Sequence, residues 1–256
     1  MRVITPCGQM ESPDARPDDA RLTLCRDGER VIGAFLDAPQ GITAVHDRAL
    51  AALDRGRVMI VYIDGLGYSL YDRATLPFIK RTFPCEPARS AYPPLTQPCM
   101  ASMLTGVWPE GHGIRSRRDH RPSAPSLMAV PGAVWIEGDT APLTLERPPI
   151  LTLPQGQETV DGAVLRVALD AARTDAPLLI VHFHGLDDLE HEVGDDLPSL
   201  QAKLAEMDEA VKRLCEAFHG TVILCADHGA HREGDGGAHG AFDHRDMVVP
   251  LGEAVL

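Results

Sequence analysis

The chain has 256 residues, of which 44% are hydrophobic and 24% are charged, and its formal net charge at pH 7 is −13. This composition is typical of a folded globular protein with a sizeable core and excludes a disordered or fibrous chain. Because the negative charge is spread along the sequence, a general binder of nucleic-acid phosphates is also excluded, and we expect no nucleic acid as a bulk partner.

Two further patterns bear on where the protein works. The first residues lack the apolar run of a signal peptide, and no stretch approaches the roughly 20 apolar residues of a membrane span. The six cysteines form no CxxC pair, so neither a disulfide framework nor a zinc ribbon is expected. We therefore expect a cytoplasmic protein without a membrane partner, and the sequence leaves its oligomeric state open.

Residues 1–30 are polar and rich in Pro and Asp, which predicts a loosely ordered lead-in or an edge hairpin before a first strand in VIGAFL. Continuous apolar runs that end in a polar residue then follow at 58–64, 176–185 and 220–227. Such runs are typical of strands covered on both faces of a parallel sheet.

Helical patterns separate these runs, at 74–83, 97–105, 160–173 and 197–218. The alternation of strands and helices predicts one domain over residues 1–256, an α/β protein with three α/β/α layers and a mainly parallel central sheet. Residues 115–155 are rich in Pro, Arg and Gly with little periodicity, so we expect a small cap excursion there.

Polar side chains follow the three expected strands, at the edge where open parallel sheets bind ligands. Each of these motifs is ambiguous alone; Asp64-Gly65, for example, is typical of an ordinary turn after a strand. His191 lies four residues after Asp187, which places both side chains on the same face of a helical turn. Together they predict two divalent ions with three protein ligands each. The six expected ligands are Asp64, Asp187, His191, Asp227, His228 and His239.

Thr96 lies in LTQPCMASMLTGVWPEGHGI, just before a Pro at the start of an expected helix. A hydroxyl in this position is typical of an ordinary helix cap, and the alternative is a nucleophile. No Ser-His-Asp order or GxSxG motif is present, so coordination to a metal is the available way to activate this hydroxyl. Two ions about 4 Å apart would suit an in-line displacement at phosphorus, with Thr96 completing one metal shell.

In order along the chain, IDGLG, the Thr96 segment, DDLEHEVG, ADHGAH and GGAHG resemble the motifs of the alkaline phosphatase superfamily. The similarity spans residues 58–250 and is greatest to the nucleotide pyrophosphatase/phosphodiesterase and phosphonoacetate hydrolase branches. It implies an alkaline phosphatase-like fold and a covalent phosphothreonine intermediate on Thr96. It also implies two zinc-type sites, one from Asp187, His191 and His239, the other from Asp64, Asp227 and His228 with Thr96 bridging to it.

The expected function is therefore hydrolysis of a small phosphoric ester, diester or monoester, with two divalent metal ions. Mixed carboxylate and imidazole ligands suit zinc or manganese. A phosphonate hydrolase that cleaves a carbon–phosphorus bond is one alternative, and a metal-binding pseudoenzyme is another. A sulfatase is disfavoured, because residues 96–100 read TQPCM rather than the C/S-x-P-x-R of that group.

Three features depart from the family pattern. Cys99 stands where diesterase members carry an Asn that helps to hold a phosphoryl oxygen, and Glu190 stands where the family often has Gly. The large insertions of nucleotide-specific relatives are missing, so only residues 115–155 are left to form a lid.

Other polar residues near the motifs are ambiguous. The stretch RSRRDHR could be a solvated loop or could clamp a carboxylate or second phosphate through Arg115, Arg117 and Arg118. A last group of side chains is interpreted as structural or as hydrogen-bond partners of the ligands: His182, His184, His231, Asp188 and Asp243.

Overall fold

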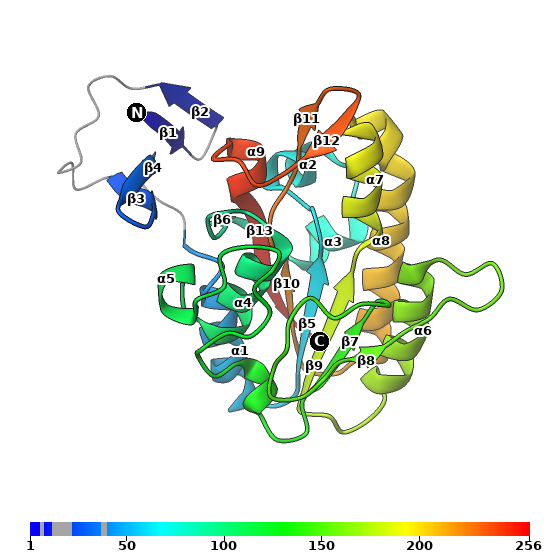
Figure 1. Cartoon of the computed structure of the whole chain (residues 1–256). Coiled ribbons are helices and arrows are strands. Elements are labelled where there is room, and N and C mark those ends of the chain that lie inside the picture. Colours follow the sequence, from blue (N-terminus) through cyan, green and yellow to red (C-terminus); the bar gives the residue numbers. More distant parts are fainter. Residues whose placement is uncertain (6–7, 12–21, 37–39) are drawn as a thin grey trace.

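The computed structural model describes residues 1–5, 8–11, 22–36 and 40–256. Its centre is a seven-stranded sheet with the strand order β6-β13-β10-β5-β9-β7-β8 (Figure 1). The strands are β5 (Val58–Ile63), β6 (Glu86–Arg89), β7 (Val134–Glu137), β8 (Ile150–Leu151), β9 (Leu178–Phe183), β10 (Thr221–Cys225) and β13 (Val248–Val255). Neighbours from β10 to β8 pair in parallel, whereas β13 is antiparallel to both β10 and β6. The sheet is thus mainly parallel, as predicted.

The middle of the sheet is formed by the three strands that the apolar runs predicted. Every residue of β5, β9 and β10 is buried, and Val58 of β5 pairs with Leu178 on one side and Thr221 on the other. Continuous apolar sequence is required because helices cover both faces of these strands.

Figure 1 shows helices on both sides of the sheet, which gives the three layers that the alternating pattern predicted. One side carries α1 (Ala44–Leu53), α4 (Thr96–Thr105) and α5 (Pro109–His112). The other carries α3 (Pro77–Thr82), α6 (Val160–Ala172) and α8 (Leu197–Ala217). Three further helices lie near the carboxyl ends of the parallel strands: α2 (Tyr68–Arg73), α7 (Gly185–Val193) and α9 (His244–Met247).

Helix α8 shows how the sequence determines an element. Asp196 caps it by accepting a hydrogen bond from the Ser199 backbone N–H at 3.2 Å, and Pro198 occupies the first turn, where its missing N–H costs nothing. α8 packs against α3, α6 and α7, and its apolar positions at spacings of three and four are all buried: Leu200, Leu204, Met207, Val211 and Leu214.

The segment 115–155 differs from the expected cap, because two of its parts belong to the central sheet. β7 pairs with β9 and β8 pairs with β7, which extends the sheet at one edge. Between α5 and β7 the chain forms only a 3-10 turn at Leu127–Ala129. β7 has only four residues, which is too short to give a periodic signal. Its partner strand β9 lies more than 40 positions further along the chain, so the pairing leaves no local pattern in the sequence.

In the N-terminal residues the expected strand in VIGAFL is present and pairs as a hairpin with the strand before it, but these strands are not at the edge of the central sheet. They form a separate sheet of order β2-β1-β4-β3, in which VIGAFL belongs to β4. Its strands are β1 (Arg2–Thr5), β2 (Gly8–Glu11), β3 (Leu22–Asp27) and β4 (Arg30–Leu36). Phe35 packs edge-on against Phe242 at 5.6 Å, and Arg2 donates a hydrogen bond to the Phe242 carbonyl at 2.7 Å. The part of the expected lead-in at 12–21 lies outside the described residues.

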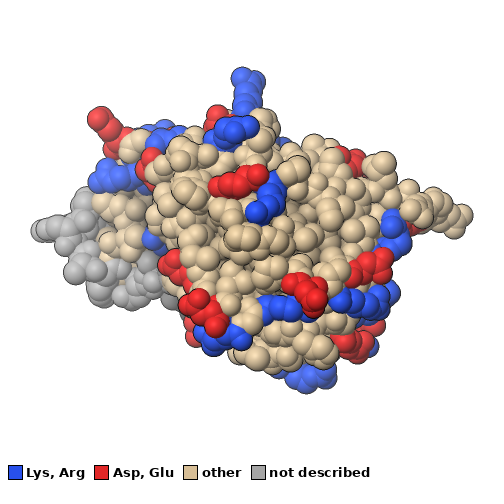
Figure 2. Space-filling view, turned by 90° about the horizontal axis from the view of Figure 1, so that it is seen from below, with Lys and Arg blue, Asp and Glu red and all other residues tan. Residues whose placement is uncertain are grey.

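The surface carries charges of both signs. Figure 2 shows Lys and Arg side chains interspersed with Asp and Glu side chains on the face seen from below. Among the helices of the described ranges, none combines the length and the apolar character needed to cross a bilayer.

Candidate metal centre

The expected ligands come from the carboxyl ends of β5, β9 and β10 and from the hairpin β11 (His231–Glu233) and β12 (Gly236–Ala238). Asp64 follows β5, and Asp227 with His228 follows β10. Asp187 and His191 lie one turn apart on α7, which begins after β9, and His239 directly follows β12. The parallel register of the three strands therefore places side chains from distant parts of the sequence at one edge of the sheet.

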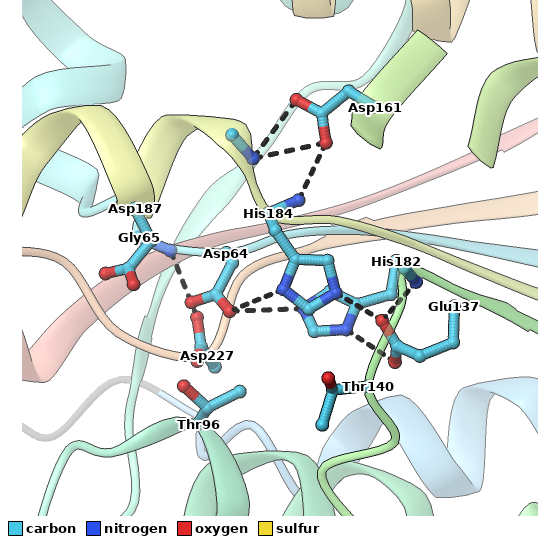
Figure 3. Close-up of polar contacts among 12 residues, drawn as sticks. Asp64, Gly65, Thr96, Glu137, Thr140, Asp161, His182, His184, Asp187 and Asp227 are labelled. Carbon is cyan, nitrogen blue, oxygen red and sulfur yellow. Dashed lines mark hydrogen bonds and ion pairs between the residues drawn. The ribbon is translucent and has the colours of Figure 1, made fainter. Parts of the chain in front are cut away.

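Asp64, Asp227 and His228 form a compact buried group at this edge. His228 Nε2 lies 3.0 Å from Asp227 Oδ2 and 3.4 Å from Asp64 Oδ1, and none of the three residues is more than 2% exposed. The Gly65 backbone N–H donates to Asp227 Oδ1 at 3.3 Å, which orients that carboxylate (Figure 3). The ligand atoms of the group all lie within 4.8 Å of one another.

Asp187, His191 and His239 lie beside this group. The ligand atoms of Asp187, His239 and His228 all lie within 4.8 Å of one another, a set that does not include His191. His191 Nε2 lies 3.3 Å from Asp187 Oδ2, and His239 Nε2 lies 3.8 Å from Asp187 Oδ1. The rings of His228 and His239 stack with centroids 3.7 Å apart, so the two groups adjoin. All six expected ligands thus meet at one place, whereas their assignment to individual ions stays a prediction.

Thr96 is the first residue of α4, and Leu95 before it occupies the N-cap position. Thr96 Oγ1 lies 3.5 Å from His228 Nε2. Figure 3 shows the hydroxyl pointing toward Asp227. The hydroxyl thus lies beside the buried group of Asp64, Asp227 and His228, and its role as a nucleophile stays a prediction.

The carboxylates of the site fit divalent cations. Asp64 Oδ1, Asp187 Oδ1 and Asp227 Oδ2 are buried and accept no hydrogen bond from the described residues. Burial raises the pKa of Asp64 well above its usual value, and the nearby Asp227 and Asp187 carboxylates raise it further. Buried carboxylate oxygens that accept no hydrogen bond are costly, and cations between them and the imidazoles would remove this cost.

His239 is held in the form that binds metals. Its Nδ1 lies 2.9 Å from the Pro94 carbonyl, so Nδ1 carries the proton and Nε2 presents its lone pair. Burial, with the neighbouring His228, lowers the pKa of His239 to about 4, which keeps the ring neutral near pH 7. Arg117 Nη2 lies 2.8 Å from this Nε2.

Only one of the three loop arginines reaches the centre. The Arg115 and Arg118 backbone N–H groups instead belong to a turn that Ser116 and Asp119 stabilise. Arg117 is therefore the residue of this loop that the structure adds to the site.

The two departures from the family motif occupy different environments. Cys99 is fully buried, and its thiol lies 3.1 Å from Ser90 Oγ and 3.8 Å from the Ala91 carbonyl, which favours packing in the core. Glu190 is also buried, but both its carboxylate oxygens accept no hydrogen bond from the described residues. Burial raises the pKa of Glu190 well above its usual value, and the Asp187 and Asp64 charges add to this.

One residue beside the centre was missed in the sequence. Glu137, at the end of β7, is fully buried and contacts the rings of both His182 and His184. The sequence offered a weak signal, a lone Glu after VWI, within the segment interpreted as a cap. Of the other polar residues, His231 bonds to Asp246 at 2.8 Å, and Asp243 caps α9 through the Arg245 N–H.

The model of the family described as type I phosphodiesterase / nucleotide pyrophosphatase matches residues 58–127 and 116–247. The chain belongs to this family, as the motifs predicted. The matched range includes every expected metal ligand and Thr96.

Curated relatives match a shorter part of the chain. GPI ethanolamine phosphate transferase 3 of Schizosaccharomyces pombe is 30% identical over 93 residues, which are 35% of this chain and 10% of that protein. The catalytic subunit of human GPI ethanolamine phosphate transferase 2 is 31% identical over 88 residues, 31% of this chain and 9% of that protein. The match thus spans about a tenth of the length of these relatives.

Solved structures share the alkaline phosphatase-like fold. A 2-O GAG sulfatase gives a TM-score of 0.61 at 15% identity, covering 78% of this chain and 64% of that one. Murine ectonucleotide pyrophosphatase/phosphodiesterase 5 gives a TM-score of 0.57 at 15% identity, covering 70% of this chain and 58% of that one. A second structure of that protein holds AMP and is an inactive variant in which a threonine is replaced by alanine. It gives a TM-score of 0.56 at 16% identity, covering 70% of this chain and 58% of that one.

Proposed function

We propose that this protein is a metal-dependent hydrolase of phosphoric esters and that Thr96 is its nucleophile. The observation that carries the proposal is the position of Thr96 Oγ1, 3.5 Å from His228 Nε2 and beside carboxylates whose buried oxygens accept no hydrogen bond. Family membership supports phosphoryl chemistry. The inactive threonine-to-alanine variant of the murine structural neighbour supports a threonine in this role.

Two divalent ions, zinc or manganese, would be held by the two groups of ligands at the sheet edge. Asp64, Asp227 and His228 form one group, and the other consists of Asp187, His191 and His239. When bound, such ions neutralise the carboxylates and draw negative charge from the phosphoryl oxygens and the attacking hydroxyl.

The reaction would proceed in two displacements at phosphorus. Thr96 Oγ forms a bond to phosphorus while the bond from phosphorus to the ester oxygen breaks, and the departing alcohol takes up the proton that Thr96 loses. Water then attacks the phosphothreonine, the Oγ–phosphorus bond breaks, and Thr96 regains a proton. Because Thr96 begins the ten-residue helix α4, the helix dipole favours the anionic phosphoryl group at this point.

A phosphoryl transferase is the second candidate, because the curated relatives are ethanolamine phosphate transferases. The first displacement is the same for both reactions. A transferase passes the phosphoryl group from Thr96 to an alcohol, whereas a hydrolase passes it to water. Cleavage of a carbon–phosphorus bond, the alternative from the sequence, differs in the leaving group.

The test uses metal-reconstituted protein with p-nitrophenyl phosphate, bis-p-nitrophenyl phosphate and phosphonoacetate, each with and without ethanolamine as acceptor. Products are identified by phosphorus NMR. Thr96→Ala is compared with the wild type and with Thr43→Ala, a matched control at the start of α1, where Thr43 makes no capping bond.

The proposal predicts chelator-sensitive release of phosphate or monoester that Thr96→Ala abolishes and Thr43→Ala retains. Phosphoryl ethanolamine as the main product would establish the transferase instead. Phosphate from phosphonoacetate alone would establish the phosphonate hydrolase. Protein that binds metal and turns over none of these substrates would overturn the proposed hydrolase and favour a binding role.

A further inference from the structure

We infer that Asp64, His182 and His184, oriented by Glu137, form a third cation site beside the two groups described above. The donor set of two imidazoles and a carboxylate suits a divalent transition metal such as zinc or manganese. The ligand atoms of Asp64, His182 and His184 all lie within 4.8 Å of one another.

Two imidazole rings connect two carboxylates in this cluster (Figure 3). On one side His182 Nδ1 lies 2.8 Å from Glu137 Oε2, and His184 Nε2 contacts Glu137 Oε1. On the other side Asp64 Oδ2 lies 3.2 Å from His182 Nε2 and 3.7 Å from His184 Nδ1. Each ring therefore presents one nitrogen to Glu137 and the other to Asp64.

These contacts determine where the lone pairs lie. An ionised Glu137 only accepts hydrogen bonds, so the nitrogens that face it, His182 Nδ1 and His184 Nε2, carry the protons. In a neutral ring the opposite nitrogen is then a bare lone pair. Both bare nitrogens face Asp64 Oδ2, so two imidazole lone pairs and a carboxylate oxygen converge on one place. A cation between them would be coordinated by all three atoms.

The role of Glu137 matches that of a carboxylate behind metal-binding histidines. Such histidines almost always donate their second N–H to a carboxylate, carbonyl or water, which sets the tautomer and raises the basicity of the ligand. Here a single buried glutamate does this for both rings. The centroids of the two rings lie 3.8 Å apart, which brings both ligand nitrogens to the same carboxylate oxygen.

Neighbouring groups hold the ligands in place. The His182 ring stacks flat on Tyr62 with centroids 3.9 Å apart and an interplanar angle of 3°. Asp161 accepts hydrogen bonds from the backbone N–H groups of His184 at 2.9 Å and Gly185 at 3.1 Å, which secures the turn from β9 into α7. The ligands thus come from rigid elements, as a preorganised metal site requires.

Asp64 connects this cluster to the two-metal centre. Its Oδ2 faces His182 and His184, whereas its Oδ1 faces His228 Nε2 at 3.4 Å. A cation on the Oδ2 side would hold the carboxylate with Oδ1 toward His228. Loss of this cation should therefore weaken metal binding at the Asp227 and His228 group as well.

The metal content of reconstituted protein tests the inference without any assay of turnover. Protein is loaded with Mn²⁺ or Zn²⁺, freed of loosely bound ions and measured by mass spectrometry. We expect three ions per chain in the wild type and in His120→Ala, whose ring lies in an exposed loop, and fewer in His184→Ala and Glu137→Gln. Equal metal content in the wild type and His184→Ala would overturn the inference.

Anomalous diffraction from wild-type crystals soaked in Mn²⁺ tests it without a variant. The expected result is a peak bounded by Asp64 Oδ2, His182 Nε2 and His184 Nδ1, separate from peaks at the other two groups. Peaks at those two groups alone would overturn the third site while leaving the proposed hydrolase intact. Conversely, a third peak in protein that hydrolyses no ester would support the site and not the proposed activity.

Discussion

Arg117 donates a hydrogen bond to His239 Nε2 at 2.8 Å, so its guanidinium occupies the lone pair that a metal ion would use. The other ring nitrogen of His239 already bonds to the Pro94 carbonyl. A cation and Arg117 must therefore compete for one nitrogen. When the cation binds, the guanidinium is released at the edge of the centre, where its planar fork suits an anionic oxygen of the substrate.

The first prediction concerns this arginine. Arg117→Ala should raise KM for phosphoric esters about 10- to 100-fold with little change in kcat, because a charge-assisted hydrogen bond to substrate is lost. Steady-state kinetics of reconstituted enzyme measure this. Arg118→Ala is the matched control, since Arg118 is exposed in the same loop. A fall in kcat at unchanged KM would show that Arg117 acts in the displacement instead.

The second prediction concerns metal removal. Because buried carboxylate oxygens at the sheet edge accept no hydrogen bond, divalent ions should stabilise the folded state more than the unfolded state. Free ion at roughly 100 times Kd should raise Tm by about 5 to 10 °C over chelator-treated protein. Scanning calorimetry gives this shift. In Asp227→Asn the shift should shrink, and an equal shift there would mean that the stabilising ions bind elsewhere.

The third prediction is a pH dependence of stability. Burial raises the pKa of Asp246 to about 6, against the opposing hydrogen bond from His231. The folded state therefore binds a proton that the unfolded state has released, and Asp246 lowers the free energy of unfolding as pH rises from about 4 to about 6. In metal-free protein, Asp246→Asn should gain up to about 3 kcal/mol relative to the wild type between pH 4 and 7.

Urea unfolding at several pH values measures the Asp246 effect. Asp235→Asn, on the exposed turn of the β11–β12 hairpin, is the control and should follow the wild type. A difference between Asp246→Asn and the wild type that does not change with pH would contradict the assigned proton uptake.

The fourth prediction concerns Cys99. Burial raises the pKa of its thiol far above the usual range, so in folded protein Cys99 should not react with a disulfide reagent. Cys99→Ala should cost about 1 kcal/mol of stability and leave kcat/KM within about threefold. Thiol labelling, urea unfolding and kinetics test the three parts. A large rise in KM without loss of stability would instead place the thiol against the substrate.

The middle of the central sheet and the edge at which the expected ligands meet could be predicted because their signals are local. β5, β9 and β10 are uninterrupted apolar runs, and the polar residues directly after them mark the edge of a parallel sheet. The ligand spacing of Asp187 and His191 is one helical turn, which a sequence shows directly.

Features that depend on distant pairing could not be predicted. β7 is only four residues long. Its pairing with β9 brings Glu137 into contact with His182, which lies 45 positions further along the chain. Likewise β1 pairs in parallel with β4, 30 residues later, across a polar stretch that gave no periodic signal. In the sequence Arg117 could not be distinguished from Arg115 and Arg118, because only the fold of the loop brings its guanidinium to His239.

The place of β13 in the sheet has a consequence for biosynthesis. β6 joins the sheet only through β13, which lies between β6 and β10 and is translated after all the other strands of that sheet. β6 leads into Thr96, so the Thr96 segment leaves the ribosome long before the strand that anchors it. A nascent chain could then assemble the parallel strands early, but Thr96 would reach its position beside His228 only after residues 248–255 had emerged.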